Sequence, residues 1–239
     1  MTMMRVLALS SAGKDSSLSL DWALYKGWEV AAIVTVLAQP ESWMFQHPCV
    51  DVARLHAEAL GIRWIPVEVL GEINDLGVLE RVLREEVVQA KDACHPIGGL
   101  VSGAIASDYQ KVRIDRIGAR LGISTFTPLW HHEPESHLQD VCDAGLDARI
   151  VHTAADGLDA QWIGVRLEQE SLVRLQKVAL RHRIRVDGEG GEFETTVLNA
   201  PWMVRAISLE GTISQTTLAS TFEAHSATWS DVPAVVVRE

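Results

Sequence analysis

The first chemically distinctive stretch of the chain is SSAGKDS, residues 10–16. It follows a short apolar run, Arg5–Leu9, and leads into a segment with helical spacing of its apolar residues, Asp15–Lys26. A turn between a strand and a helix directs backbone N–H groups and the helix N-terminus at whatever enters it. Lys14 adds a cation and the serines add hydroxyl donors, so the stretch is suited to holding pyrophosphate.

Two common phosphate-binding patterns do not fit this turn. A Walker loop needs glycine five residues before the Gly-Lys pair, where this chain has Ala8. The dinucleotide pattern G-x-G-x-x-G is absent. A Ser/Gly turn that only caps a helix remains the alternative.

Strand-like and helix-like segments alternate through the first half of the chain. This alternation predicts an α/β fold, a doubly wound parallel sheet with helices on both faces. After Arg5–Leu9 and Asp15–Lys26, the expected strands are Glu29–Leu37, Arg63–Val69, Gly99–Ser102 and Ser124–Leu129, and the expected helices are Val50–Leu60, Leu76–Lys91 and Tyr109–Leu121.

The pattern changes after Trp130, where a polar, proline-containing stretch indicates a domain boundary. We expect one domain over residues 1–130 and a smaller α+β domain over 131–239. In the second we expect helices at Ser136–Ala144 and Glu168–His182 and strands at Ala148–Thr153, Thr195–Leu198, Met203–Leu209, Thr212–Ser214 and Thr217–His225.

Composition narrows the function classes. The chain has 239 residues and a formal net charge of −11, which argues against a large nucleic-acid footprint. Its three widely spaced cysteines, Cys49, Cys94 and Cys142, give neither a disulfide framework nor a zinc-ligand pair. The longest apolar run, Val30–Ala38, is too short to span a bilayer, and the N-terminus shows no signal-peptide cleavage pattern. The sequence therefore predicts a soluble cytoplasmic protein.

A second motif, GLVSGAIASDYQKVR, occupies residues 99–113. Ligands of doubly wound sheets bind beyond the carboxyl ends of the strands, where Ser102 and Gly103 are expected. Gly103 would allow close approach of a backbone. Asp108 and Arg113 could serve phosphate, metal or substrate. A surface helix with a capping residue and solvated charges is an equally good reading.

A third motif, GEGGEFET, occupies residues 188–195 and brings Glu189, Glu192 and Glu194 together around Gly190 and Gly191. Carboxylates this close repel one another and favour a nearby cation. The functional reading is a site for Mg²⁺, a cationic substrate or an ammonium ion. The alternative is an acidic surface hairpin.

In this order, the three motifs resemble those of the diphthine–ammonia ligase family, whose PP-loop reads S-G-G-K-D-S. The resemblance covers nearly the whole chain. Ala12 stands where the family has glycine, which would cost energy if the backbone there requires a positive φ. Gln46 and Asn199 stand where the family more often has histidine and aspartate.

The resemblance implies an adenine nucleotide α-hydrolase (HUP) fold, with a PP-loop ATP-binding domain at 1–130 and a substrate-binding domain at 131–239. It implies that diphthine on translation elongation factor two, ammonia and ATP are converted to diphthamide, AMP and pyrophosphate, with Mg²⁺ bridging phosphate oxygens. The expected partners are thus ATP, ammonia and the diphthine-bearing factor, without stable nucleic acid or membrane; a homo-oligomer is left open.

The resemblance also implies residue roles. Catalysis is assigned to Lys14, Asp15 and Ser16, and nucleotide binding to Ser11, Ala12, Gly13, Lys14, Ser16, Ser102 and Gly103. Acceptor binding is assigned to Asp108, Arg113, Glu189, Gly190, Gly191, Glu192, Glu194 and Thr195. No residue is assigned as a metal ligand, and the cluster of His131, His132 and His137 is interpreted as a solvated linker.

Two rival readings stay open. One is a PP-loop ATP-pyrophosphatase that adenylates another acceptor, a small-molecule carboxylate or a tRNA base. The other is an adenine-nucleotide-binding protein without turnover, which would bind ATP and release no pyrophosphate.

Overall fold

The computed structural model describes residues 3–37, 50–69 and 75–238. Cys49 and Gln46 lie outside this range. The chain forms two units, one of Met1–Ser11 with Asp15–Trp130 and the other of Ala12–Lys14 with His131–Glu239. The second unit thus takes in three residues of the SSAGKDS loop. Among the described residues, none of the helices combines the length and the apolar character needed to cross a membrane.

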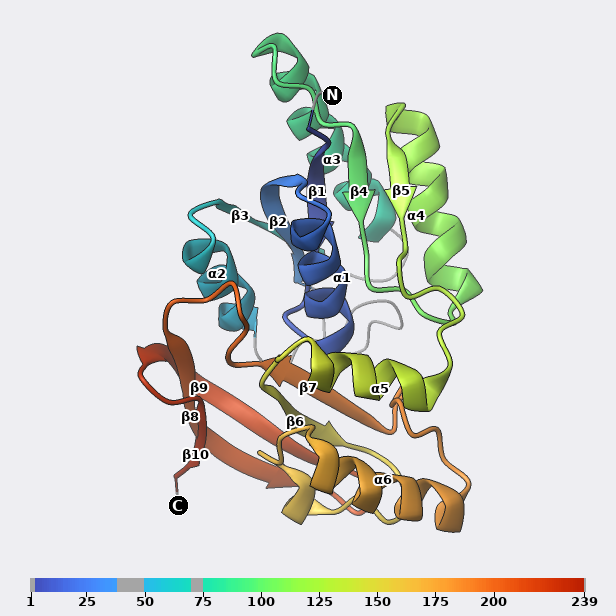
Figure 1. Ribbon diagram of the computed structural model, residues 1–239, viewed down its shortest axis with the longest axis vertical. Coiled ribbons are helices and arrows are strands. Elements are labelled where there is room, and N and C mark those ends of the chain that lie inside the picture. Colours follow the sequence, from blue (N-terminus) through green and yellow to red (C-terminus); the bar gives the residue numbers. More distant parts are fainter. Residues whose placement is uncertain (1–2, 38–49, 70–74, 239) are drawn as a thin grey trace. The chain divides into compact units, whose positions relative to one another are not determined.

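The first unit is built on a five-stranded sheet in the order β3-β2-β1-β4-β5, and all four pairs of neighbours are parallel. The predicted parallel α/β fold is confirmed (Figure 1). Its strands are β1 (Arg5–Leu9), β2 (Glu29–Leu37), β3 (Arg63–Glu68), β4 (Gly99–Val101) and β5 (Ser124–Phe126). Its helices are α1 (Lys14–Tyr25), α2 (Val50–Ala59), α3 (Asp75–Asp92) and α4 (Asp108–Leu121).

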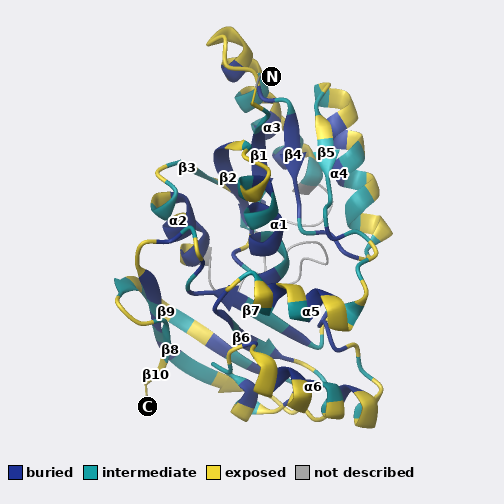
Figure 2. Ribbon diagram, viewed as in Figure 1, coloured by how far each residue is buried: buried dark blue, intermediate teal, exposed yellow. Residues whose placement is uncertain are grey.

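The strand order reverses between β1 and β4, so right-handed crossovers toward the two edges of the sheet put their helices on opposite faces. α3 and α4 share a buried apolar cluster with the sheet, which includes Leu7 of β1, Val34 of β2 and Leu100 of β4. Figure 2 shows β1 and β4 as largely buried strands, whereas much of the surface of the helices is exposed. The carboxyl ends of β1 and β4, neighbours at the reversal, are where this fold class binds ligands.

Local signals in the sequence set the ends of these helices. Ser107 caps α4 by accepting a hydrogen bond from the Gln110 amide, and Gly122 ends the helix at φ 69°. Gly61, just after α2, also has a positive φ of 66°. Glycine adopts this left-handed conformation without the steric cost of a Cβ, so both glycines stop a helix and turn the chain toward the next strand.

The second unit contains a mixed five-stranded sheet in the order β10-β8-β9-β6-β7. Among the described strands of this sheet, β10 and β8 pair in parallel and the other pairs are antiparallel. Its strands are β6 (Ala148–Thr153), β7 (Phe193–Val197), β8 (Ala206–Gln215), β9 (Ser220–Ser230) and β10 (Ala234–Val237). Its helices are α5 (Pro134–Asp143), the 3-10 turn η1 (Ala160–Trp162) and α6 (Gln169–His182).

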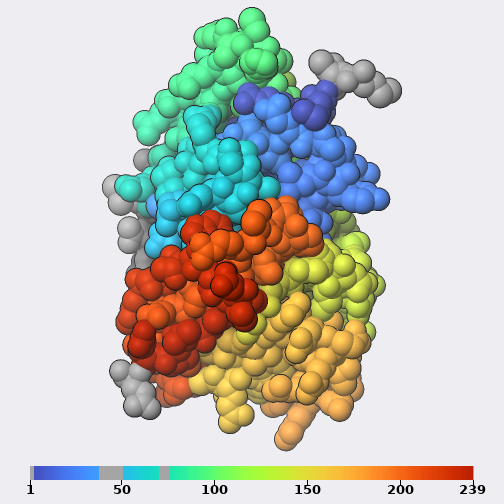
Figure 3. Space-filling view, turned by 60° about the vertical axis from the view of Figure 1, so that its left-hand side comes forward, coloured from blue at the N-terminus to red at the C-terminus, as the bar shows by residue number. Residues whose placement is uncertain are grey.

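The prediction of two strands at Met203–Leu209 and Thr212–Ser214 is wrong. They form the single strand β8, which is irregular where Glu210 meets Gly211. A Cβ at Gly211 would overlap the carbonyl oxygen of Glu223, so only glycine fits. The glycine that suggested a break between two strands is therefore required by packing within one strand. β10 and η1 were not predicted from the sequence. The face over β8–β10 is drawn orange to red in Figure 3, and Leu218 and Val232 of this segment are exposed.

A buried carboxylate ties β6 to its surroundings. Asp147 is 3% exposed and its carboxylate lies 2.5 Å from Nε of Arg149 and 3.3 Å from Nε of Arg166. Its backbone exchanges hydrogen bonds with Leu198 and Asn199, which directly follow β7. These backbone hydrogen bonds and the ion pairs of Asp147 therefore hold the start of β6 against the end of β7.

Replacing Asp147 by alanine is expected to lower the free energy of unfolding by about 2 kcal/mol, because the half-buried guanidinium of Arg149 and the more exposed one of Arg166 lose their carboxylate partner. The matched control is Glu210→Gln, which removes an exposed partner of Arg238 and should change stability by less than about 1 kcal/mol. Urea unfolding of both variants measures the difference. Equal losses in the two would show that the Asp147 cluster has no special role.

Candidate functional site

The SSAGKDS loop joins β1 to α1, as its sequence predicts. β1 ends at Leu9 and α1 begins at Lys14, so the intervening amides precede a helix N-terminus. Ala12 adopts φ 64° and is fully buried. The backbone here does take the positive φ at which alanine is disfavoured, so alanine stores strain of roughly 1–2 kcal/mol.

The third motif lies against the middle of this loop, within the second unit. The backbone N–H of Lys14 donates to Oγ1 of Thr195 at 3.0 Å, and that of Val197 donates to the carbonyl of Ala12 at 2.8 Å. The ammonium of Lys14 lies 5.5 Å from the centroid of the Phe193 ring. β7 therefore braces the loop on both sides of Gly13, although 181 residues separate Lys14 from Thr195.

Glu194 sits on β7 between these two contacts. Burial raises the pKa of its carboxyl to about 7, and the nearby Lys14 ammonium offsets part of that rise. Across the β6–β7 pair its partner is His152, whose Nδ1 lies 2.8 Å from Oγ1 of Thr221. Burial lowers the pKa of His152, which favours the neutral ring. Near neutral pH, Glu194 thus exists in both charge states beside a fixed cation.

The other carboxylates of the motif differ from Glu194. Glu192 accepts hydrogen bonds from the amides of Arg185 and Gly190, each at 2.8 Å, and so closes the turn before β7. Gly191 continues that turn at φ 86°, and both glycines are exposed. Glu189 is half-buried, and its amide donates to Asp187. The three carboxylates predicted as a group therefore occupy three distinct environments.

The first unit places the second motif against the start of α1. A Cβ built on Gly103 would lie 2.6 Å from the Ser16 amide nitrogen and 2.7 Å from the Asp15 carbonyl carbon. Gly103 thus permits close backbone approach, as expected. Its neighbour Ser102 is 3% exposed, and the Ser102 hydroxyl has no hydrogen-bond partner among the described residues. Ser10 also donates to the Ser16 hydroxyl at 3.2 Å.

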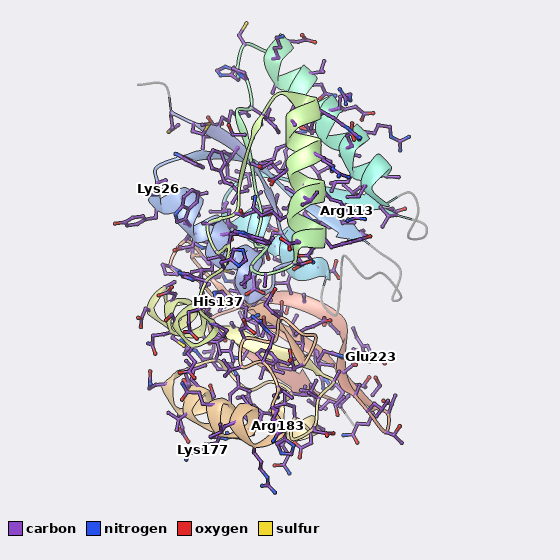
Figure 4. All side chains as sticks on the ribbon, turned by 90° about the vertical axis from the view of Figure 1, so that its right-hand side faces the viewer. Lys26, Arg113, His137, Lys177, Arg183 and Glu223 are labelled. Carbon is purple, nitrogen blue, oxygen red and sulfur yellow. The ribbon has the colours of Figure 1, made fainter. Side chains whose placement is uncertain are left out.

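These observations fit a phosphate-bearing ligand. A buried hydroxyl without a partner is costly, and a ligand oxygen would satisfy Ser102. The first turn of α1 presents amides to the same kind of group. Among the described residues, however, no three His, Cys, Asp or Glu side chains cluster as a metal site. His132 and His137, whose rings lie 6.2 Å apart, therefore do not belong to such a cluster. Figure 4 labels His137 on α5.

Asp108 and Arg113 both lie on α4 in the first unit. Asp108 is the first residue of the helix and is exposed. Arg113, labelled in Figure 4, stacks on the Tyr109 ring at 3.2 Å from its centroid and donates to the Tyr109 carbonyl at 3.1 Å. Arg113 therefore has a local partner, so an acceptor-binding role for it would require this contact to give way.

The residues that hold the beginning of the loop were missed from the sequence. The hydroxyl of Thr35, buried in β2, donates to the Ser10 carbonyl at 2.9 Å and accepts from Nε1 of Trp64 at 2.9 Å. The Ser10 amide in turn donates to the Val34 carbonyl. The available signal was one threonine in an otherwise apolar buried strand, where a hydroxyl needs partners.

Thr35→Val preserves the shape of this side chain and removes its hydroxyl. The carbonyl of buried Ser10 and Nε1 of half-buried Trp64 then lose a partner, and the free energy of unfolding should fall by roughly 1–3 kcal/mol. Thr212→Val is the control, because its hydroxyl meets only His225, at 3.4 Å on the surface. The melting temperature and the nucleotide affinity of both variants are measured and compared with those of the wild type. An unaltered melting temperature in Thr35→Val would exclude the bracing role.

Known sequences resemble this chain over nearly its full length. The diphthamide synthase N-terminal domain matches residues 4–125, and the diphthamide synthase C-terminal domain matches residues 133–221. The chain is 29% identical to the diphthine–ammonia ligase of Bos taurus over 92% of its length and 88% of the relative's. It is 28% identical to that of Homo sapiens, with 87% and 83% covered.

A relative of the same name from Schizosaccharomyces pombe is 32% identical over 86% of this chain, but the match spans only 36% of the relative's own length. Among solved structures, a predicted tRNA methyltransferase subunit from Methanocaldococcus jannaschii aligns with a TM-score of 0.41 at 15% identity. That alignment covers 83% of this chain and 98% of the other, and no conclusion rests on it.

Proposed function

Because the chain belongs to the diphthamide synthase family, we propose that it is the ATP-dependent ligase that converts diphthine on translation elongation factor two into diphthamide. The carrying observation is the ordered match of both family domains along one chain. The contacts of Lys14 with Thr195 and Phe193 support it, since they bring two of the three motifs together.

The reaction requires a carboxylate to be activated before ammonia can replace one of its oxygens. In the proposed route an oxygen of the diphthine carboxylate attacks the α-phosphorus of ATP, and pyrophosphate leaves. Ammonia then attacks the acyl carbon, the C–N bond forms, and AMP departs with the bridging oxygen. The protein's contribution is to orient the groups and to stabilise the charge that develops.

We assign the phosphates to the SSAGKDS loop and the end of β4. Lys14 would offset negative charge on the leaving pyrophosphate, while Asp15 and Ser16 open α1 beside it. The hydroxyl of Ser102 is available to a ligand oxygen, and Gly103 keeps the backbone close to Asp15 and Ser16. The nucleotide-binding set remains Ser11, Ala12, Gly13, Lys14, Ser16, Ser102 and Gly103.

We assign the acceptor to the GEGGEFET motif and the start of α4. Diphthine carries a trimethylammonium group, which carboxylates attract. Glu189 and Glu194 are the members suited to this, because Glu192 already closes its own turn. The proposed set is Asp108, Arg113, Glu189, Gly190, Gly191, Glu192, Glu194 and Thr195.

Mg²⁺ is proposed to arrive with ATP. This ion usually keeps several waters and binds one or two carboxylates together with substrate phosphates, so a preformed protein cage is not required. It would supply charge neutralisation at the phosphate oxygens. We also propose that the enzyme works in the cytoplasm, where its protein substrate is used.

The function is tested with purified protein, Mg-ATP, an ammonium salt and elongation factor two bearing diphthine. We expect pyrophosphate release that depends on the factor, with a mass change on the factor that matches conversion of a carboxylate to an amide. Pyrophosphate release that does not depend on the factor would indicate another acceptor. ATP binding without release under every condition would refute the ligase.

A further inference from the structure

A half-buried carboxylate next to the loop that we assign to the phosphates has no evident task in binding phosphate. Glu194 occupies this position: it follows Phe193, over whose ring the Lys14 ammonium lies, and it precedes Thr195, which accepts the Lys14 amide. Its charge would repel ATP if no cation stood near it. A group so placed suits a small cation that enters with the substrates, and the proposed reaction consumes one, ammonium.

We propose that Glu194 is the base that takes a proton from ammonium and so generates the ammonia nucleophile, an inference that rests on the ligase function proposed above. Ammonium has no lone pair on nitrogen and cannot attack a carbonyl. A base beside the acyl group is therefore needed when the nitrogen donor enters in its charged form.

The proton balance is simple. Ammonium passes one proton to the Glu194 carboxylate and becomes ammonia. The ammonia nitrogen bonds to the acyl carbon, the bond from that carbon to the AMP oxygen breaks, and its electron pair leaves with AMP. The nitrogen loses its second surplus proton to water, and Glu194 later returns its own proton to water.

Burial makes Glu194 a stronger base than an exposed carboxylate, and the charged group nearest to it partly opposes this effect. From the loop, the Lys14 ammonium stabilises the ionised carboxylate, and from β6 the cross-strand residue is His152, whose ring burial keeps neutral. Glu192 is occupied by two amides. Burial raises the Glu194 pKa to about 7, so this carboxyl can both accept and release a proton near neutral pH.

Hydroxylamine separates this role from the others, because it is already a neutral nucleophile near pH 7. In Glu194→Gln, amide formation from ammonium at pH 7 should fall by about 10²-fold or more. Hydroxamate formation from hydroxylamine, with the same ATP and protein acceptor, should stay within about threefold of wild type, the spread expected for a substitution that leaves activation intact. Glu210→Gln on β8, whose carboxylate pairs with Arg238 at the surface, is the matched control and should leave both reactions unchanged.

The wild-type protein provides a second measurement that does not depend on the variant folding. Its ammonium reaction should rise with pH up to about 7, as Glu194 becomes ionised, and then level off, whereas a reaction fed by free ammonia would keep rising; its hydroxylamine reaction should not show that step. Equal losses with both nucleophiles in Glu194→Gln, or the same pH step with both, would overturn the inference and leave Glu194 as a support for Lys14. A wild-type protein that makes neither product would instead refute the ligase itself.

Discussion

Replacing Lys14 by alanine is expected to lower acceptor-dependent pyrophosphate release by about 10²–10³-fold, the usual cost of removing one group that stabilises charge in a transition state. Lys14 is 4% exposed and its backbone amide donates to Thr195, so solvent cannot readily take the place of its ammonium. ATP binding should weaken much less, because the loop and helix amides remain. Steady-state pyrophosphate release at saturating ATP measures the first effect, and calorimetric titration measures the second.

Lys26→Ala is the matched control for this variant. Lys26 follows the same helix, α1, at its other end, and its ammonium lies 5.6 Å from the Trp22 ring. Its loss should leave turnover unchanged. Full activity in Lys14→Ala would contradict the role assigned to the loop cation, whereas equal losses in both variants would indicate a general effect of lost positive charge.

The second large effect is expected at Gly103. In Gly103→Ala the new methyl group would meet the backbone of Asp15 and Ser16 at 2.6–2.9 Å, closer than real Cβ contacts allow. Backbone cannot rotate away as a side chain can, so the beginning of α1 must shift. A displacement of even about 1 Å near reacting groups can cost about 10²-fold in rate. We expect kcat/KM for ATP to fall by that order and the free energy of unfolding to fall by about 1–3 kcal/mol.

Gly77→Ala isolates the steric cause. Gly77 lies in α3, and nothing stands within 4 Å of a Cβ built there. Alanine is the better helix former by roughly 0.8–1.0 kcal/mol, so this variant should be as stable as wild type or more so, with unchanged kinetics. Circular dichroism melting and ATP kinetics on both variants make the comparison. A fully active Gly103→Ala protein would show that the β4 end does not need to approach α1 closely.

Much of the first unit could be predicted because its signals are local. β1 and β2 coincide with the predicted strands, and α4 begins one residue before its predicted start. Buried parallel strands read as continuous apolar runs, and glycines such as Gly122 mark helix ends. The strain at Ala12 was also foreseeable, since a turn that favours glycine in related loops implies a positive φ.

The rest depends on contacts between residues far apart in sequence. Nothing in the SSAGKDS loop indicates that Thr195 would accept the Lys14 amide, or that His152 would stand opposite Glu194. The different environments of Glu192 and Glu194 follow from a turn and a strand register that one sequence does not specify. The acidic motif could therefore be located from the sequence, but its carboxylates could not be assigned separate roles.

The most direct test of the proposed chemistry follows one oxygen atom. Diphthine on elongation factor two is labelled with ¹⁸O in its carboxylate, and the enzyme is supplied with unlabelled ATP and ammonium. If the carboxylate attacks the α-phosphorus, the released AMP carries one ¹⁸O atom for each amide formed, and the pyrophosphate carries none. Label found in inorganic phosphate, together with ADP as the nucleotide product, would show attack at the γ-phosphorus and contradict cleavage between the α- and β-phosphates.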